Sequence, residues 1–357
     1  MCLRKSDICK EAQEIAIVTI DYETFGNGSG CLHNCVISPT DKLLSILNLH
    51  DVKATFYVDA LEFLQMEVWA KKHDSKFLKT IGLIKEQLKV IYESGHDLQL
   101  HLHPQWLDSP LKKGHEWSIN YDKWRIGDCS RNEINQMIEC CIDWIRNAIS
   151  SSSWSPSSFR AGGWCIQPSE TIIDCLIAKG ILSDSSVAPF CRNSHPTNWY
   201  DFKDSPDVPY WHIDSDVLRI SKSGLIETPI ATGKIFGLDL IVKKVFKKEG
   251  YQPADCNGSY LQNRTLLSSL KGKFRKLFPF NHFMADFCLL NARQIQKIHQ
   301  SWVEKYKKSN LTPIVSIGHN KNFGKHGQKT LDQYLRWLAE RKIKIATISE
   351  WTELVSQ

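Results

Sequence analysis

Two histidines, two residues apart, give the strongest chemical signal in this sequence. His101 and His103 lie in the segment GHDLQLHLHP, residues 95–104, which we expect to contain a strand over 97–102. Side chains two apart on a strand point to the same face. Both imidazoles could therefore reach one metal ion, and neutral imidazole is the commonest metal ligand.

A pair of carboxylates has the same spacing near the start of the chain. Asp21 and Glu23 follow the continuous apolar run of residues 15–20, which is typical of a buried parallel strand. Two strands that each end in a same-face polar pair indicate a metal-dependent hydrolase.

The elements that would position these residues alternate between strand and helix. Further strands are predicted at 53–58, 181–184, 224–230, 312–318 and 343–348, and helices at 40–49, 76–94, 131–149, 168–179 and 328–341. Such alternation, with polar residues at strand ends, predicts a parallel α/β barrel whose site lies at the C-terminal mouth. Five polar residues would converge there: Asp21, His101, Arg160, Asp184 and His319.

Taken in order, these segments resemble the motifs of the polysaccharide deacetylase family, the NodB-homology carbohydrate esterases. The resemblance covers residues 15–348 and rests on TIDYE at 19–23, KATFYV at 53–58, GHDLQLH at 95–101, RAGGW at 160–164, DSSV at 184–187 and IGH at 317–319. It implies an α/β fold of the distorted (β/α)7-barrel type. We expect one such domain over residues 1–357, with insertions over the mouth at about 187–223 and 231–295.

The resemblance also implies roles for individual residues. Asp21 would be the general base, with Arg160 holding it ionised. Glu23, His101 and His103 would bind one divalent cation, for which we expect Zn²⁺, and leave a position open for water. His319 would be the general acid, oriented by Asp184.

Two departures from the family pattern leave alternatives open. The family's histidines are four residues apart, whereas here Gln105 stands four after His101, so either His103 replaces the second ligand or the ligand set differs. Glu23 stands where the family has a second aspartate, so the base and ligand roles of Asp21 and Glu23 could be exchanged.

Substrate contacts are expected from residues beside these motifs. Gly163 and Trp164 end the arginine motif, and Glu227 lies at a strand end where it could line the pocket. Trp106 and Trp211 could also stack on sugar rings, although large aromatic side chains more often belong to the core.

Composition and charge bear on the partners of this protein and on its cellular compartment. The 357 residues are 42% hydrophobic and 24% charged, and the net charge of +6 gives no reason to expect nucleic-acid binding. The sequence shows no stretch typical of a signal peptide or membrane span, so we expect a cytoplasmic protein whose 12 cysteines are reduced. The basic stretches at 243–248 and 271–276 are expected to be solvated, or else to contact an anionic membrane or a substrate diphosphate.

The sequence therefore predicts a metal-dependent enzyme that removes an N-acyl group from an amino sugar. The substrate would belong to a polysaccharide or to its lipid-linked or nucleotide-linked precursor. Two alternatives remain. One is a carbohydrate-binding relative without catalysis, and the other is a metal-free glycoside hydrolase that uses two carboxylates.

Overall fold

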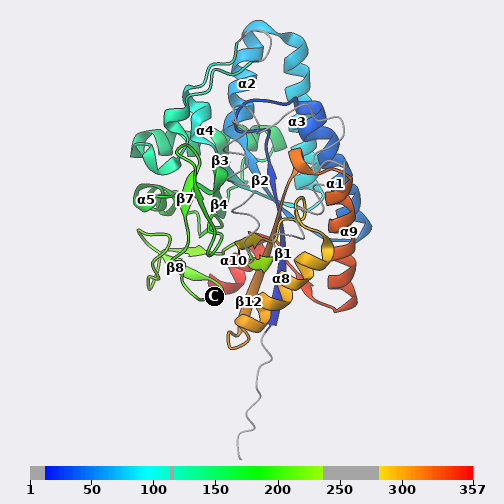
Figure 1. Ribbon diagram of the computed structural model, residues 1–357. Helices are drawn as coiled ribbons and strands as arrows, with labels where there is room; N and C mark the ends of the chain where they lie inside the picture. Colours follow the sequence, from blue (N-terminus) through cyan, green and yellow to red (C-terminus); the bar gives the residue numbers. More distant parts are fainter. Residues whose placement is uncertain (1–12, 113–115, 236–280, 357) are drawn as a thin grey trace, which may run out of the picture.

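The structure is a computed structural model that describes residues 13–112, 116–235 and 281–356 (Figure 1). Its strands in the first half are β1 (Gln13–Tyr22), β2 (Thr55–Asp59), β3 (Asp97–Leu102), β4 (Ser158–Ala161) and β5 (Ser183–Asp184). Those of the second half are β6 (Arg192–Ser194), β7 (Trp199–Asp201), β8 (Trp211–Ile213), β9 (Leu225–Glu227), β10 (Thr232–Ile235), β11 (Asn281–Met284), β12 (Leu311–His319) and β13 (Lys344–Ile345).

The α-helices surround the strands in Figure 1. They are α1 (Ser38–Leu49), α2 (Ala60–His73), α3 (Ser75–Glu93), α4 (Arg131–Ile149), α5 (Glu170–Ala178), α8 (Ala292–Lys305), α9 (Lys325–Glu340) and α10 (Ile348–Ser356).

One large sheet organises the described part of the chain. Its strand order is β12-β1-β2-β3-β4-β5-β9-β8, with β13 added beside β1. The pairs from β12 through β9 are all parallel, and only β8 pairs antiparallel, with β9. Because the C-terminal ends of parallel strands lie at one edge, polar residues at those ends are brought together.

The sheet curls until its two ends meet. Past β9, Ile230 forms a parallel bridge with Val315 of β12, and the Ala231 N–H donates to the Val315 carbonyl at 2.9 Å. Asp286 forms a second parallel bridge, with Ile317 of β12. Isolated bridges instead of a full strand pair close the circle, so the predicted distorted (β/α)7-type barrel is confirmed.

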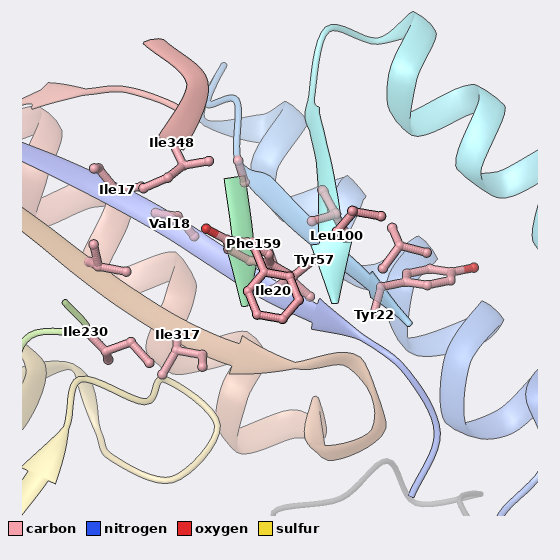
Figure 2. Close-up of a cluster of buried hydrophobic side chains, with 14 of the residues drawn as sticks. Ile17, Val18, Ile20, Tyr22, Tyr57, Leu100, Phe159, Ile230, Ile317 and Ile348 are labelled. Carbon is pink, nitrogen blue, oxygen red and sulfur yellow. The ribbon is translucent and has the colours of Figure 1, made fainter. Parts of the chain in front are cut away.

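The barrel strands are buried on both faces. Every residue of β1 from Ile15 to Tyr22 is buried, as is all of β2. Figure 2 shows side chains from β1, β2, β3, β4 and β12 in one apolar cluster with Ile230 and Ile348. Such near-continuous apolar runs are what a parallel sheet covered by helices requires.

Local signals explain where several helices begin and end. Helix α4 occupies the predicted residues 131–149 and begins at a capping box, in which Ser130 and Glu133 each bind the other's backbone. Helix α3 begins at Asp74, whose carboxylate accepts from the backbone N–H groups of Lys76 and Phe77. It is followed by Gly95 in the left-handed region, at φ 79°, a conformation in which glycine commonly ends helices.

Three elements differ from the predictions. Helices α2 and α8 were not expected. The segment predicted as a strand at 343–348 pairs only at Lys344–Ile345 and then turns into α10. Helix α2 buries Glu62 and Glu67 within its first two turns, which weakens the apolar periodicity that would have revealed it.

The expected insertions differ in how far they are described. Residues 187–223 contain the antiparallel pair β6–β7 and the edge strand β8. From 231–295 the structure describes the pair β10–β11 and the start of α8. The basic stretches at 243–248 and 271–276 lie outside the described residues.

The structure bears on the expectations about membrane spans and about the redox state of the cysteines. In the part of the chain that is described, no helix is long and apolar enough to cross a membrane. The expectation of reduced cysteines is wrong for Cys35, which is disulfide-bonded. The other described cysteines are free thiols: Cys31, Cys129, Cys140, Cys141, Cys165, Cys175, Cys191 and Cys288.

Candidate metal centre

The strand register places the predicted site residues at one edge of the barrel. Asp21 is paired with His319 across β1 and β12, and His101 with Arg160 across β3 and β4. Asp184 is paired with Glu227 across β5 and β9. All six side chains are buried, at or next to the C-terminal ends of their strands.

The acidic pair and the histidine pair converge. One ligand atom from each of Glu23, His101 and His103 lies within 4.8 Å of the others, and the same holds for Asp21, Glu23 and His319. Glu23 Oε2 is 2.8 Å from His103 Nε2 and 3.7 Å from His101 Nε2. Donor atoms of a tetrahedral zinc site stand roughly 3.3 Å apart, so small side-chain movements would fit this set to such an ion.

The histidines are oriented by different partners. His101 Nδ1 is 2.9 Å from the Arg160 carbonyl oxygen, to which it can only donate, so its Nε2 presents a lone pair toward the carboxylates. His103 Nδ1 lies 3.1 Å from Nε2 of Gln105, which also donates to the Gly26 carbonyl at 3.2 Å. Gln105 stands where the family pattern has its second histidine, and its side chain contacts His103.

Glu23 Oε2 and His103 Nε2 lie 2.8 Å apart, and beyond this contact neither atom has a hydrogen bond among the described residues; Gln105 Oε1 has none either. Ligation through His103 Nε2 would place the ring proton on Nδ1. Gln105 would then turn its unpartnered oxygen toward that nitrogen. Glu23 Oε2 and His103 Nε2, which face each other, are the two atoms that a bound cation would take up.

Arg160 is the buried cation beside Asp21. Its Nη1 donates to Asp21 Oδ1 at 2.7 Å and to Thr19 Oγ1 at 3.0 Å, while Nε and Nη2 donate to the carbonyl and hydroxyl of Ser185. The guanidinium also stacks on the Tyr57 ring, 4.1 Å from its centroid. Burial alone would raise the pKa of Asp21, but Arg160, His101 and His319 hold it below its usual value, so Asp21 is a carboxylate.

Lys321 plays the corresponding part for Glu23 and was not found from the sequence. Its Nζ is 2.7 Å from Glu23 Oε1 and donates to the Thr24 carbonyl at 2.8 Å. Burial would raise the pKa of Glu23, yet Lys321 and then His103 hold it well below its usual range. A lone lysine two residues after His319 carries no motif, and only the meeting of β1 with β12 shows its partner.

His319 faces both carboxylates. Its Nε2 lies 3.4 Å from Asp21 Oδ2 and 3.7 Å from Glu23 Oε1. Burial lowers the pKa of His319 to about 4, so its imidazole is neutral at pH 7. The Trp164 ring meets the His319 ring edge to face at 5.9 Å, which places this expected substrate contact directly beside the site.

Asp184 has other partners than the expected His319. It accepts from the backbone N–H and the hydroxyl of Ser186, and it is hydrogen-bonded to Glu227. Burial raises the pKa of Asp184, and burial together with the Asp184 charge raises the pKa of Glu227 well above its usual range, so the two carboxyl groups share a proton. His319 Nδ1 has no hydrogen-bond partner in the described residues, and the predicted orienting contact from Asp184 is absent.

Of the remaining expected substrate contacts, two tryptophans belong to the core and one glycine shapes the chain beside the site. Trp106 and Trp211 are core residues, with their indole N–H groups bonded to Asp59 Oδ2 and to the Val217 carbonyl. Gly163 adopts φ 57°, and a Cβ there would meet Asn198 Oδ1 at 2.8 Å. Gly163 thus turns the chain that presents Trp164.

A further aromatic residue, Trp124, borders the site and was not expected. Its ring meets His103 edge to face at 6.5 Å and stacks on Tyr121 at 5.8 Å. It belongs to the connection between β3 and α4, where no motif marked it.

Comparison with known proteins supports the fold. No family model matches the chain, and no curated protein matches its sequence. A Mycobacterium smegmatis protein provisionally assigned as a polysaccharide deacetylase is similar in structure, with a TM-score of 0.51 at 12% identity over 97% of this chain and 91% of that one.

Two other solved structures are less similar. An allantoinase has a TM-score of 0.47 at 10% identity, covering 97% of this chain and 91% of its own. A peptidoglycan deacetylase from Bacillus subtilis has a TM-score of 0.37 at 11% identity, covering 97% and 93%. The strand order, the barrel closure and the similarity to the M. smegmatis protein agree with the motif resemblance: this chain has the fold of the polysaccharide deacetylases.

Proposed function

We propose that this protein hydrolyses an N-acyl group, in particular an N-acetyl group, from an amino sugar with the help of one divalent cation, Zn²⁺. The observation that carries the proposal is the buried cluster of Glu23, His101 and His103, whose ligand atoms lie within 4.8 Å of one another. One carboxylate and two imidazoles leave an open coordination position, as catalytic zinc sites require. Bound there, the cation would lower the pKa of water and polarise the acyl carbonyl.

Asp21 is proposed as the general base. Arg160 occupies its Oδ1 at 2.7 Å, while Oδ2 faces His319 and His101. A buried carboxylate held by one fixed donor keeps its second oxygen free to accept a proton from the attacking water. Glu23 could exchange roles with Asp21, but its oxygens face Lys321 and the histidine pair, which supports the ligand role.

His319 is proposed as the general acid. Because its pKa is lowered to about 4 by burial, it begins neutral and must first receive a proton. Asp21 Oδ2, 3.4 Å from Nε2, can pass on the proton that it has taken from water. Nε2 can then protonate the amine that leaves.

The substrate side of the proposal rests on the aromatic residues around this centre. Trp164 beside His319 and Trp124 beside His103 offer faces for a sugar ring. Glu227 is hydrogen-bonded to Asp184 and accepts from the Val187 N–H, so we assign it a structural role beside Arg160. We assign the substrate contact to Trp164. A polysaccharide or its lipid-linked or nucleotide-linked precursor stays the proposed substrate.

The first test is metal content. Elemental mass spectrometry of the purified protein should find about one divalent ion per chain, and His101→Ala/His103→Ala should lose it. A matched control, His33→Ala/His195→Ala, removes two exposed imidazoles and should keep the ion. Released acetate from N-acetylated amino sugars would then identify the substrate.

A protein that takes up no ion even after reconstitution would contradict the proposed mechanism. The two remaining hypotheses would then be a metal-free glycoside hydrolase and a carbohydrate-binding relative without catalysis. Binding of sugars without turnover would favour the second of these.

A further inference from the structure

Lys321 is built into the metal centre rather than placed at its rim. It lies in the short turn Asn320–Asn322 that directly follows β12, and its side chain is only 2% exposed. Its Nζ is held between Glu23 Oε1 at 2.7 Å and the Thr24 carbonyl at 2.8 Å. Glu23 therefore has one oxygen on the lysine and turns the other, Oε2, toward the histidines.

The charges of the cluster are already balanced without a cation. Arg160 is paired with Asp21 at 2.7 Å, and Lys321 with Glu23 at 2.7 Å. A divalent ion among Glu23, His101 and His103 would therefore enter a buried site whose two carboxylates are already neutralised. It would also lie close to the positive charge of Lys321, which contacts Glu23. Like charges a few ångströms apart in a buried site repel strongly.

We infer that Lys321 is a positioning residue that weakens the affinity of this site for divalent cations while fixing Glu23 to offer one oxygen only. The inference rests on the proposed metal site. Ion binding at this centre would then be readily reversible, and the cause would be Lys321, which is not itself a ligand.

The sign of the effect separates this role from a merely structural one. If Lys321 only held Glu23 in place, its removal would loosen the ligand and weaken metal binding. If its charge dominates, its removal strengthens binding. Lys321→Met removes the charge with little change in length, and Lys321→Arg keeps it.

The experiment measures the dissociation constants of Zn²⁺ and Co²⁺ by competition with a chromophoric chelator, on protein stripped of metal. We expect Lys321→Met to bind each ion about tenfold more tightly, or better, than the unaltered protein. Lys321→Arg should bind as the unaltered protein does. The control Lys85→Met breaks a similar ion pair, 2.7 Å from Glu67, in the helical layer, and should leave the affinity unchanged.

Equal or weaker binding by folded Lys321→Met, beside measurable binding by the unaltered protein, would overturn the inference and leave the proposed function standing. No binding by any variant, Lys321→Met included, would overturn both. If Lys321→Met does not fold, as judged by circular dichroism, Lys321→Gln makes the same comparison, because it keeps a donor for Glu23 without the charge.

Discussion

Asp21 and His319 are paired in register at the C-terminal ends of β1 and β12, with 3.4 Å between Asp21 Oδ2 and His319 Nε2. The two residues are 298 positions apart in the sequence, yet adjacent strands place them side by side. This pairing gives the proposed base and acid a direct route for a proton, and the predictions below follow from it and from the groups around it.

Asp21→Asn should abolish turnover and leave sugar binding intact. The amide oxygen can still accept from Arg160, but it cannot take a proton from water, and loss of a general base costs about 10²- to 10⁴-fold in rate. Initial rates and sugar binding by calorimetry would be compared with those of the unaltered protein. Full activity in the variant would transfer the base role to Glu23.

Arg160→Met should strongly destabilise the fold. The guanidinium is fully buried and makes five contacts of hydrogen-bond or stacking type, so its removal leaves Asp21 as a buried unpaired charge, at about 3–5 kcal/mol. Urea unfolding measures the change in free energy. The control Arg131→Met breaks an ion pair of the same length, 2.7 Å, on the surface, where little change is expected; equal losses would contradict the argument.

Gln105→Leu should weaken metal binding by about 10- to 100-fold, because partners that orient a ligating imidazole matter by that much. Gln105 contacts His103 Nδ1, and no other side chain in the described residues is bonded to that nitrogen. Chelator competition measures the affinity. Gln333→Leu, an exposed change on α9, is the control, and unchanged affinity in Gln105→Leu would mean that His103 is oriented by its backbone alone.

His96 should make the fold sensitive to mild acid. Burial, and then Lys53, lowers the pKa of His96 to about 4, while in the unfolded chain it is about 6.5. Between these values only the unfolded state takes up the proton, so stability is lost as the pH falls from 6.5 toward 4.

The expected contribution of His96 is a loss of about 2 kcal/mol between pH 7 and pH 5. His96→Asn keeps an acceptor for the Ala54 N–H, which His96 Nδ1 now accepts at 3.2 Å, and should lose correspondingly less stability over that range. Urea unfolding of both proteins at the two pH values measures the difference. An identical pH dependence would show that other groups govern it.

Much of the site could be predicted because strand geometry is local. The two-residue spacing of Asp21 with Glu23, and of His101 with His103, is sufficient to place each pair on one face, and parallel strands present their C-terminal ends at one edge. Helix α4 was predicted to the residue from its apolar periodicity, and the capping box at its start is likewise a local feature.

Other features escaped prediction because their cause lies far along the chain. Lys321 acts on Glu23 across 298 positions, and Asp184 is hydrogen-bonded to Glu227 of another strand and not to the expected His319. Trp124 and the helix α2 carry no distinctive pattern: one lies in a connection, and the other buries acidic side chains.

By itself, then, the sequence determined the strand–helix alternation, the barrel and the pairs of potential ligands, since these depend on backbone periodicity and on which side chains avoid water. Only the tertiary structure decided which charge faces which. The Lys321–Glu23 pair and the proton shared by Asp184 and Glu227 both form between segments that are far apart in the sequence. Electrostatic energy in a buried site depends on distances of a few ångströms, and those distances are set only when the barrel closes.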